Sequence, residues 1–234
     1  MYNQSKKDEE FLLKKIQIED EKNHFVGFLE YTNLNFACYN IFESKNYIDG
    51  RNDFYTASLI RLYMNNKFNE NIFAVHRSFC ATIISDSEKI INRYLELEDS
   101  FLDTFSSAFC KAVQSAIKND NLGLIEYIDK LKIHTQKKTV GENYSGVING
   151  FKGVLENDKT LIEQGIKEIL EKHNKQEHPA VVNDFINLEA LMFAKIAYRK
   201  GIVIEVDNPL LPTNMFQINE LGKYESYDFL NEIL

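Results

Sequence analysis

The chain has 234 residues, of which 44% are hydrophobic and 26% are charged, a composition that excludes an intrinsically disordered protein and allows one large or two small domains. Its net charge of −8 excludes nucleic-acid binding through broad neutralisation of phosphates and is compatible with a basic partner. No apolar run approaches the roughly 20 residues that cross a bilayer, and residues 1–22 lack the apolar core of a signal peptide.

Helix breakers and cysteines are both scarce. Three prolines and ten glycines favour helices joined by short turns, so we expect an all-α fold. Cys38, Cys80 and Cys110 are odd in number and lie among apolar residues. They are predicted to be buried free thiols of a reducing compartment, and the expected localisation is therefore cytoplasmic.

The first third of the chain shows helical periodicity. Apolar residues over 11–36 predict either one long helix or two consecutive helices, broken or kinked near Asp20–Asn23. The Asp49-Gly50 pair indicates a turn, after which Asp53 is expected to cap a helix to about Asn65. Further helices are predicted over residues 69–84, 86–95, 100–117 and 124–132. Asn69 is expected to cap the first of these, and Asp86 or Ser87 the second.

A helical hairpin is predicted from 142–155 and 158–172, with Asp158 as the cap of its second helix. Gly146, Gly150 and Gly153 fall on one face of the first helix. Because each mid-helix glycine costs roughly 1 kcal/mol against alanine, this stripe indicates a compensating benefit. The favoured interpretation is close helix–helix approach, and the alternative is a shallow groove in which a partner docks.

The next element is predicted as one helix over 179–200, with Pro179 at its first position and Gly201 after its end. Its apolar residues point in nearly every direction, which is typical of a buried helix. Glu189 lies among them and is expected to be buried, so it needs a cation or a hydrogen-bond donor. Lys195 and Arg199 lie on one edge, together with Asp184 and Asn187.

Beyond Gly201 the chain is predicted to be extended over the β-branched segment 202–206. Three placements stay open for this segment: along the bundle, in a small hairpin, or across a homodimer. Asp207-Asn208-Pro209 predicts a turn, and Leu210 and Leu211 are expected to pack on the core before Pro212. The tail 224–234 is predicted as a short amphipathic helix with three inward residues, Tyr227, Leu230 and Leu234.

The sequence contains no recognisable catalytic or metal-binding motif. No two of the five histidines have the i, i+4 spacing of helical metal ligands, and His173 and His178 are expected to be exposed in a polar link. His76 and Cys80 are spaced i, i+4, for which core packing is favoured over a catalytic thiolate. There is no phosphate loop or nucleophile elbow. We therefore predict no enzyme activity, cofactor or metal.

Two blocks of the C-terminal third resemble the immunity protein 49 family of bacterial polymorphic toxin systems. One is the hairpin 151–166, and the other comprises Leu188-Glu-Ala-Leu, Ala194-Lys-Ile-Ala-Tyr-Arg-Lys-Gly201 and Val206-Asp-Asn-Pro-Leu-Leu-Pro212. The resemblance implies an immunity protein that binds a cognate toxin and neutralises it by stoichiometric occlusion. The acidity of the chain suits a basic toxin, such as a nuclease. It marks six residues as determinants of the fold rather than of binding: Glu189, Arg199, Gly201, Asp207, Pro209 and Pro212.

The predicted architecture is a single all-α domain over 1–234, with helices of 8–118 packed against those of 121–234 in antiparallel pairs. A tetratricopeptide-like arrangement of these pairs is an open possibility. The alternative function is correspondingly a helical scaffold or peptide-binding regulator without a toxin partner.

Overall fold

Eleven α-helices and short 3-10 turns make up the described part of the chain, residues 2–18, 23–98, 103–137 and 140–233 of this computed structural model. The fold is all-α, as predicted, and no strand occurs in these ranges. The helices are α1 Tyr2–Ile18, α2 Asn23–Phe42, α3 Tyr47–Phe68, α4 His76–Ile84, α5 Glu88–Leu95, α6 Phe105–Lys118, α7 Asn121–Gln136, α8 Gly146–Glu156, α9 Lys159–Glu171, α10 Ala180–Phe185 and α11 Leu188–Arg199.

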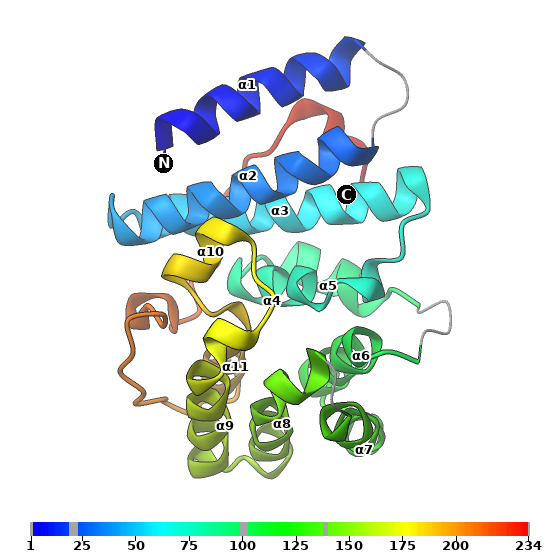
Figure 1. Cartoon of the computed structure of the whole chain (residues 1–234), viewed down its shortest axis with the longest axis vertical. Coiled ribbons are helices and arrows are strands. Elements are labelled where there is room, and N and C mark those ends of the chain that lie inside the picture. The colour runs from blue at the N-terminus through cyan, green and yellow to red at the C-terminus, as the bar shows by residue number, and fades with distance from the viewer. Residues whose placement is uncertain (1, 19–22, 99–102, 138–139, 234) are drawn as a thin grey trace.

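The helices form two groups that run in different directions (Figure 1). Helices α1, α2 and α3 lie across the view, whereas α7, α8 and α9 are seen nearly end-on. Helices α4 and α11 pack against each other and join the two groups through one continuous hydrophobic core. This arrangement does not show the tetratricopeptide-like stack of helix pairs that the sequence left open. None of the helices in the described ranges is long and apolar enough to cross a membrane.

The predicted turn at Asp49-Gly50 is wrong, because these residues lie in the first turn of α3. The helix begins after Asn46, whose side chain accepts a hydrogen bond from the backbone N–H of Asp49 at 3.2 Å. Gly50 faces α2, where an added Cβ would lie 2.7 Å from Cγ1 of Ile41. The glycine thus serves helix contact, and Asp53 lies inside α3 rather than capping it.

Several other predicted boundaries also move. Asn69 ends α3 in the left-handed conformation, with φ of 56°, instead of starting the next helix. Ser87 precedes α5 as predicted. Helix α6 starts at Phe105, after Thr104 accepts a hydrogen bond from the N–H of Ser107 at 3.1 Å, and the earlier start predicted at residue 100 lies outside the described residues. The break predicted at 20–23 falls between α1 and α2, mostly in undescribed positions.

The hairpin of α8 and α9 is confirmed. Asp158 caps α9 through the N–H of Leu161 at 3.1 Å. A Cβ added to Gly146 would lie 2.6 Å from the carbonyl oxygen of Gly165. A Cβ added to Gly153 would lie 2.5 Å from the backbone N of Ile162. The glycine stripe therefore permits close approach of the two backbones, as the favoured interpretation predicted.

The single helix predicted over 179–200 is wrong, because the chain breaks between α10 and α11. Asn187 is extended, with φ of −98° and ψ of 108°, and its side chain accepts a hydrogen bond from the N–H of Ala190 at 2.9 Å. Its own N–H donates to the carbonyl of Leu210 at 3.0 Å. Asparagine competes with helical hydrogen bonding in this way, and here it starts a new helix. The predicted burial is confirmed, since residues 188–197 are all buried.

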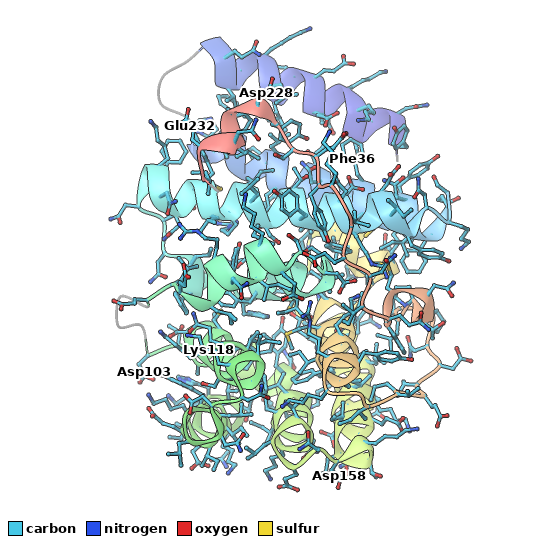
Figure 2. The ribbon with its side chains drawn as sticks, turned by 180° about the vertical axis from the view of Figure 1, so that it is seen from behind. Phe36, Asp103, Lys118, Asp158, Asp228 and Glu232 are labelled. Atoms are coloured by element: carbon cyan, nitrogen blue, oxygen red, sulfur yellow. The ribbon has the colours of Figure 1, made fainter. Side chains whose placement is uncertain are left out.

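The C-terminal segment, residues 201–233, returns across the molecule without regular strand pairing in its described residues. Its part 202–206 lies along α9, where the N–H of Glu205 donates to Glu163 at 2.8 Å. The tail then crosses α3 and ends in a 3-10 turn, Asp228–Ile233, rather than the predicted helix (Figure 2). Leu230 points inward as predicted, Tyr227 is half-buried, and Leu234 lies outside the described residues.

Candidate functional site

Glu189 forms the centre of a buried polar network beneath α4. Its Oε1 atom accepts a hydrogen bond from Nε2 of His76 at 2.8 Å and lies 3.8 Å from Nε of Arg77. Burial alone would raise the pKa of Glu189, but the hydrogen bond from His76 and nearby positive charges such as Arg77 lower that pKa to about 2. The carboxylate is therefore ionised and has the donor that its burial was predicted to require.

A second buried cluster surrounds Asp86 in the turn between α4 and α5. Its Oδ2 atom lies 2.5 Å from Nζ of Lys195 and 2.8 Å from Nε of Arg51. Both cations also donate to the carbonyl of Gln217, at 3.0 and 3.2 Å. Burial lowers the pKa of Lys195 to about 8, although the charge of Asp86 opposes that shift. The cluster thus ties α3 and α11 to the C-terminal segment.

The other residues of the family-like motif are not gathered into one site. Arg199 hydrogen-bonds to Glu88 at 2.5 Å, on the edge of the Asp86 cluster. Gly201 ends α11 with φ of +76°, a conformation that favours glycine. Of the remaining three, Asp207 and Pro209 are exposed and Pro212 is half-buried. Their role as determinants of the fold stays a prediction.

The prediction that His173 is solvent-exposed is wrong. It is buried, its Nε2 donates to the carbonyl of Asn183 at 2.7 Å, and its Nδ1 accepts from Asn187 at 3.0 Å. His178 is half-buried and stacks on His173 with 4.5 Å between ring centroids, and burial lowers the pKa of His178 to about 4. No group of three metal-ligating side chains occurs among the described residues.

The three cysteines are buried thiols outside any disulfide, as predicted. Sγ of Cys80 lies 3.8 Å from Sδ of Met192, in the core. Burial, reinforced by the charge of Glu189, raises the pKa of the Cys80 thiol well above its ordinary value. A thiol in this environment stays protonated, so Cys80 is a core residue as the favoured interpretation held.

An acidic cleft of about 400 Å³ lies on the side of α2 that faces α1, α3 and the C-terminal segment. Phe36, labelled in Figure 2, forms part of its wall. Each carboxylate that lines the cleft has a partner in the chain: Glu9 with Lys6 at 2.9 Å, Asp49 with Asn46 at 2.7 Å, Asp53 with Asn40 at 2.7 Å and Glu225 with Lys223 at 3.0 Å. Each of these carboxylates thus has a hydrogen-bond donor within the molecule, and for Glu9 and Glu225 that donor is a lysine.

A second hollow, which we call the Arg77 recess, encloses about 370 Å³. Tyr31 and Asn35 of α2, Arg77 of α4 and residues 177–181 line it. The side chain of Arg77 is 19% exposed, yet it donates no hydrogen bond to any residue that the structure describes, and its Nε is buried. The sequence alone does not predict this recess, because its walls come from three separate parts of the chain.

The comparison with protein families identifies the same family as the sequence motifs. The model of the family described as Immunity protein 49 matches residues 52–215, which extend from α3 past α11 into the C-terminal segment. No match was found among curated proteins or solved structures. Helices α1 and α2 lie outside the matched range. Because the match covers more than half of the chain, this protein belongs to the immunity protein 49 family.

Proposed function

We propose that the protein binds a cognate toxin in a stoichiometric complex and neutralises it by occluding its active surface, without catalysis of its own. Membership of the immunity protein 49 family is the observation that carries this proposal. The three buried thiols, none of them in a disulfide, support a site of action in the reducing cytoplasm.

The charge of the chain supports a basic toxin as the partner. A net charge of −8 attracts a positively charged protein over a distance of about one Debye length and accelerates its association. If the toxin is basic, the association rate constant measured by stopped flow should fall steeply between 50 and 500 mM NaCl, conditions chosen to span strong and weak screening. A rate that does not depend on salt would reject the basic partner but not occlusion.

Co-expression with a candidate toxin, chosen from the products of neighbouring genes, tests the proposed function. The toxin alone should arrest growth, and the pair should restore growth and co-purify at a ratio of one to one. A matched control is the Asp86→Asn variant, which weakens the fold and should lose protection together with soluble protein. If the folded wild-type chain neither rescues growth nor co-purifies, immunity by occlusion is wrong.

A further inference from the structure

The Arg77 recess lies between helix α2 and the residues that precede α10, on the opposite side of α2 from the acidic cleft. Tyr31 and Asn35 face the recess, whereas Asn33 and Phe36 of the same helix face the cleft. Since 100° separates successive helical residues, these two pairs point in nearly opposite directions. The Arg77 recess and the acidic cleft are therefore two separate surfaces.

Arg77 is the under-bonded group on this side. A guanidinium has five N–H donors in a planar fork. Oε1 of Glu189 lies 3.8 Å from Nε, which is close enough for an ion pair but beyond hydrogen-bond distance, and this oxygen already accepts a hydrogen bond from His76. Glu177, the carboxylate in the recess wall, is exposed and makes no ion pair with Arg77. The recess thus contains a partly desolvated guanidinium that has a long ion pair with Glu189 but no hydrogen bond to any described residue, whereas each carboxylate of the acidic cleft already has a hydrogen-bond partner.

Exposed aromatic side chains extend the recess along α2. Phe28 and Tyr31 are 56% and 43% exposed, and with Asn35 they follow the i, i+3, i+7 spacing of one helix face. Pro179 and Val181 add apolar surface on the opposite wall. Tyrosine and arginine are among the residue types enriched in binding hot spots, and the recess contains both.

The recess also combines two parts of the chain with different relations to the family. Arg77 and residues 177–181 lie within the range that matches the family, whereas Phe28 and Tyr31 lie outside it. The arginine of this surface thus belongs to the part of the fold that the family shares, whereas its exposed aromatic residues belong to α2, which the family match does not include.

We infer that the Arg77 recess and the aromatic face of α2 are the surface on which the toxin docks, and that the recess binds a carboxylate side chain of the toxin flanked by an apolar residue. This inference rests on the proposed function. The carboxylate pairs with the guanidinium of Arg77 through two hydrogen bonds, and the apolar neighbour packs on Phe28 and Tyr31. A local acidic anchor is compatible with a toxin that is basic overall, because net charge steers the encounter and the anchor fixes the docked geometry.

Affinity measurements with the purified toxin test the inference. Phe28→Ala and Tyr31→Ala should each weaken binding by about tenfold or more. Arg77→Lys, which keeps the charge but loses the planar fork, should weaken it by a similar factor. Leu122→Ala and Ile125→Ala are matched controls, since these side chains are 82% and 46% exposed on α7, and they should change affinity less than twofold.

The outcomes separate the parts of the inference. If wild type binds and the variants at 28, 31 and 77 bind as tightly, the docking surface is wrong although the proposed function holds. If the aromatic variants weaken binding but Arg77→Lys and Arg77→Gln do not, the carboxylate anchor is wrong. If wild type itself does not bind, the proposed function fails. Circular dichroism of each variant excludes unfolding, and the two aromatic variants test the surface even if Arg77→Gln is unstable.

Discussion

Asp86 and Lys195 place opposite charges 2.5 Å apart although 109 positions separate them in the sequence, and both side chains are completely buried. Their ion pair joins the turn after α4 to α11, and through Gln217 it also holds the C-terminal segment. The stability of the fold therefore depends on a contact that no local sequence pattern indicates.

Asp86→Asn should destabilise the protein by about 3–5 kcal/mol, because it leaves the buried cations Lys195 and Arg51 without their carboxylate. Urea denaturation measures this loss. Asp129→Asn is the control, since Asp129 pairs with Lys132 at 2.6 Å on the exposed surface of α7 and should contribute less than about 1 kcal/mol. Equal effects of the two substitutions would contradict the structural role of the buried cluster.

Gly165→Ala should force α8 and α9 apart. An added Cβ would lie 2.3 Å from the N of Gly150, a backbone atom that has no side-chain freedom with which to move away. We expect a loss of about 3 kcal/mol in the free energy of unfolding. At Gly222 an added Cβ meets nothing within 4 Å, so Gly222→Ala should be nearly neutral. A neutral Gly165→Ala would show that the hairpin is not closely packed.

Asn187→Ala removes the cap that separates α10 from α11. The side chain accepts a hydrogen bond from Ala190 and donates to His173 and Gln176, all within 3.0 Å. Loss of the cap and of partners for buried groups should cost about 2–4 kcal/mol. Asp158→Ala, which removes the less buried cap of α9, should cost about 1 kcal/mol in the same thermal or chemical melts. The reverse order would contradict this assignment.

Asp53 should make stability depend on pH. Burial raises the pKa of Asp53 to about 7, although the hydrogen bond from Asn40 lowers it, compared with about 3.9 in an unfolded chain. Between these values the folded protein retains a proton that the unfolded chain has released, so the free energy of unfolding falls as pH rises from about 4 to about 7.

Asp53→Asn removes this proton uptake and keeps an acceptor for Asn40. At pH 8 the variant should be more stable than wild type by about 2–4 kcal/mol, and its stability should change less between pH 4 and 7. Asp184→Asn, at an exposed position on α10, is the control and should leave the pH profile unchanged. If both profiles follow wild type, Asp53 does not titrate near pH 7.

Local signals account for the parts of the fold that were predicted correctly. Asp158 caps the helix that follows it, and the glycines of α8 mark a close backbone contact, because both effects act within a few residues or on one helix face. The errors arise where tertiary contacts compete with local preference. Gly50 resembles a turn residue but packs on Ile41, and the strongly apolar run through 188–197 hides the break at Asn187.

The candidate site could not be predicted from the sequence, because its residues come together only through long-range contacts. The burial of Glu189 followed from its apolar neighbours, but its partner His76 lies 113 positions away. Tyr31, Arg77 and His178 likewise meet only after α2, α4 and the segment before α10 have packed. Single exposed aromatic residues and single arginines are common in any sequence, so none of these residues is distinctive before folding.

Arg77 faces the recess on one side and the buried carboxylate of Glu189 on the other. A ligand that binds its guanidinium is therefore separated by two side chains, Arg77 and Glu189, from the imidazole of His76 and the rings that surround it, including Phe109 and Tyr144. Binding at the surface would consequently change the environment of a buried side chain. The imidazole resonances of His76 in an NMR spectrum would act as an internal reporter of complex formation, without any label at the interface itself.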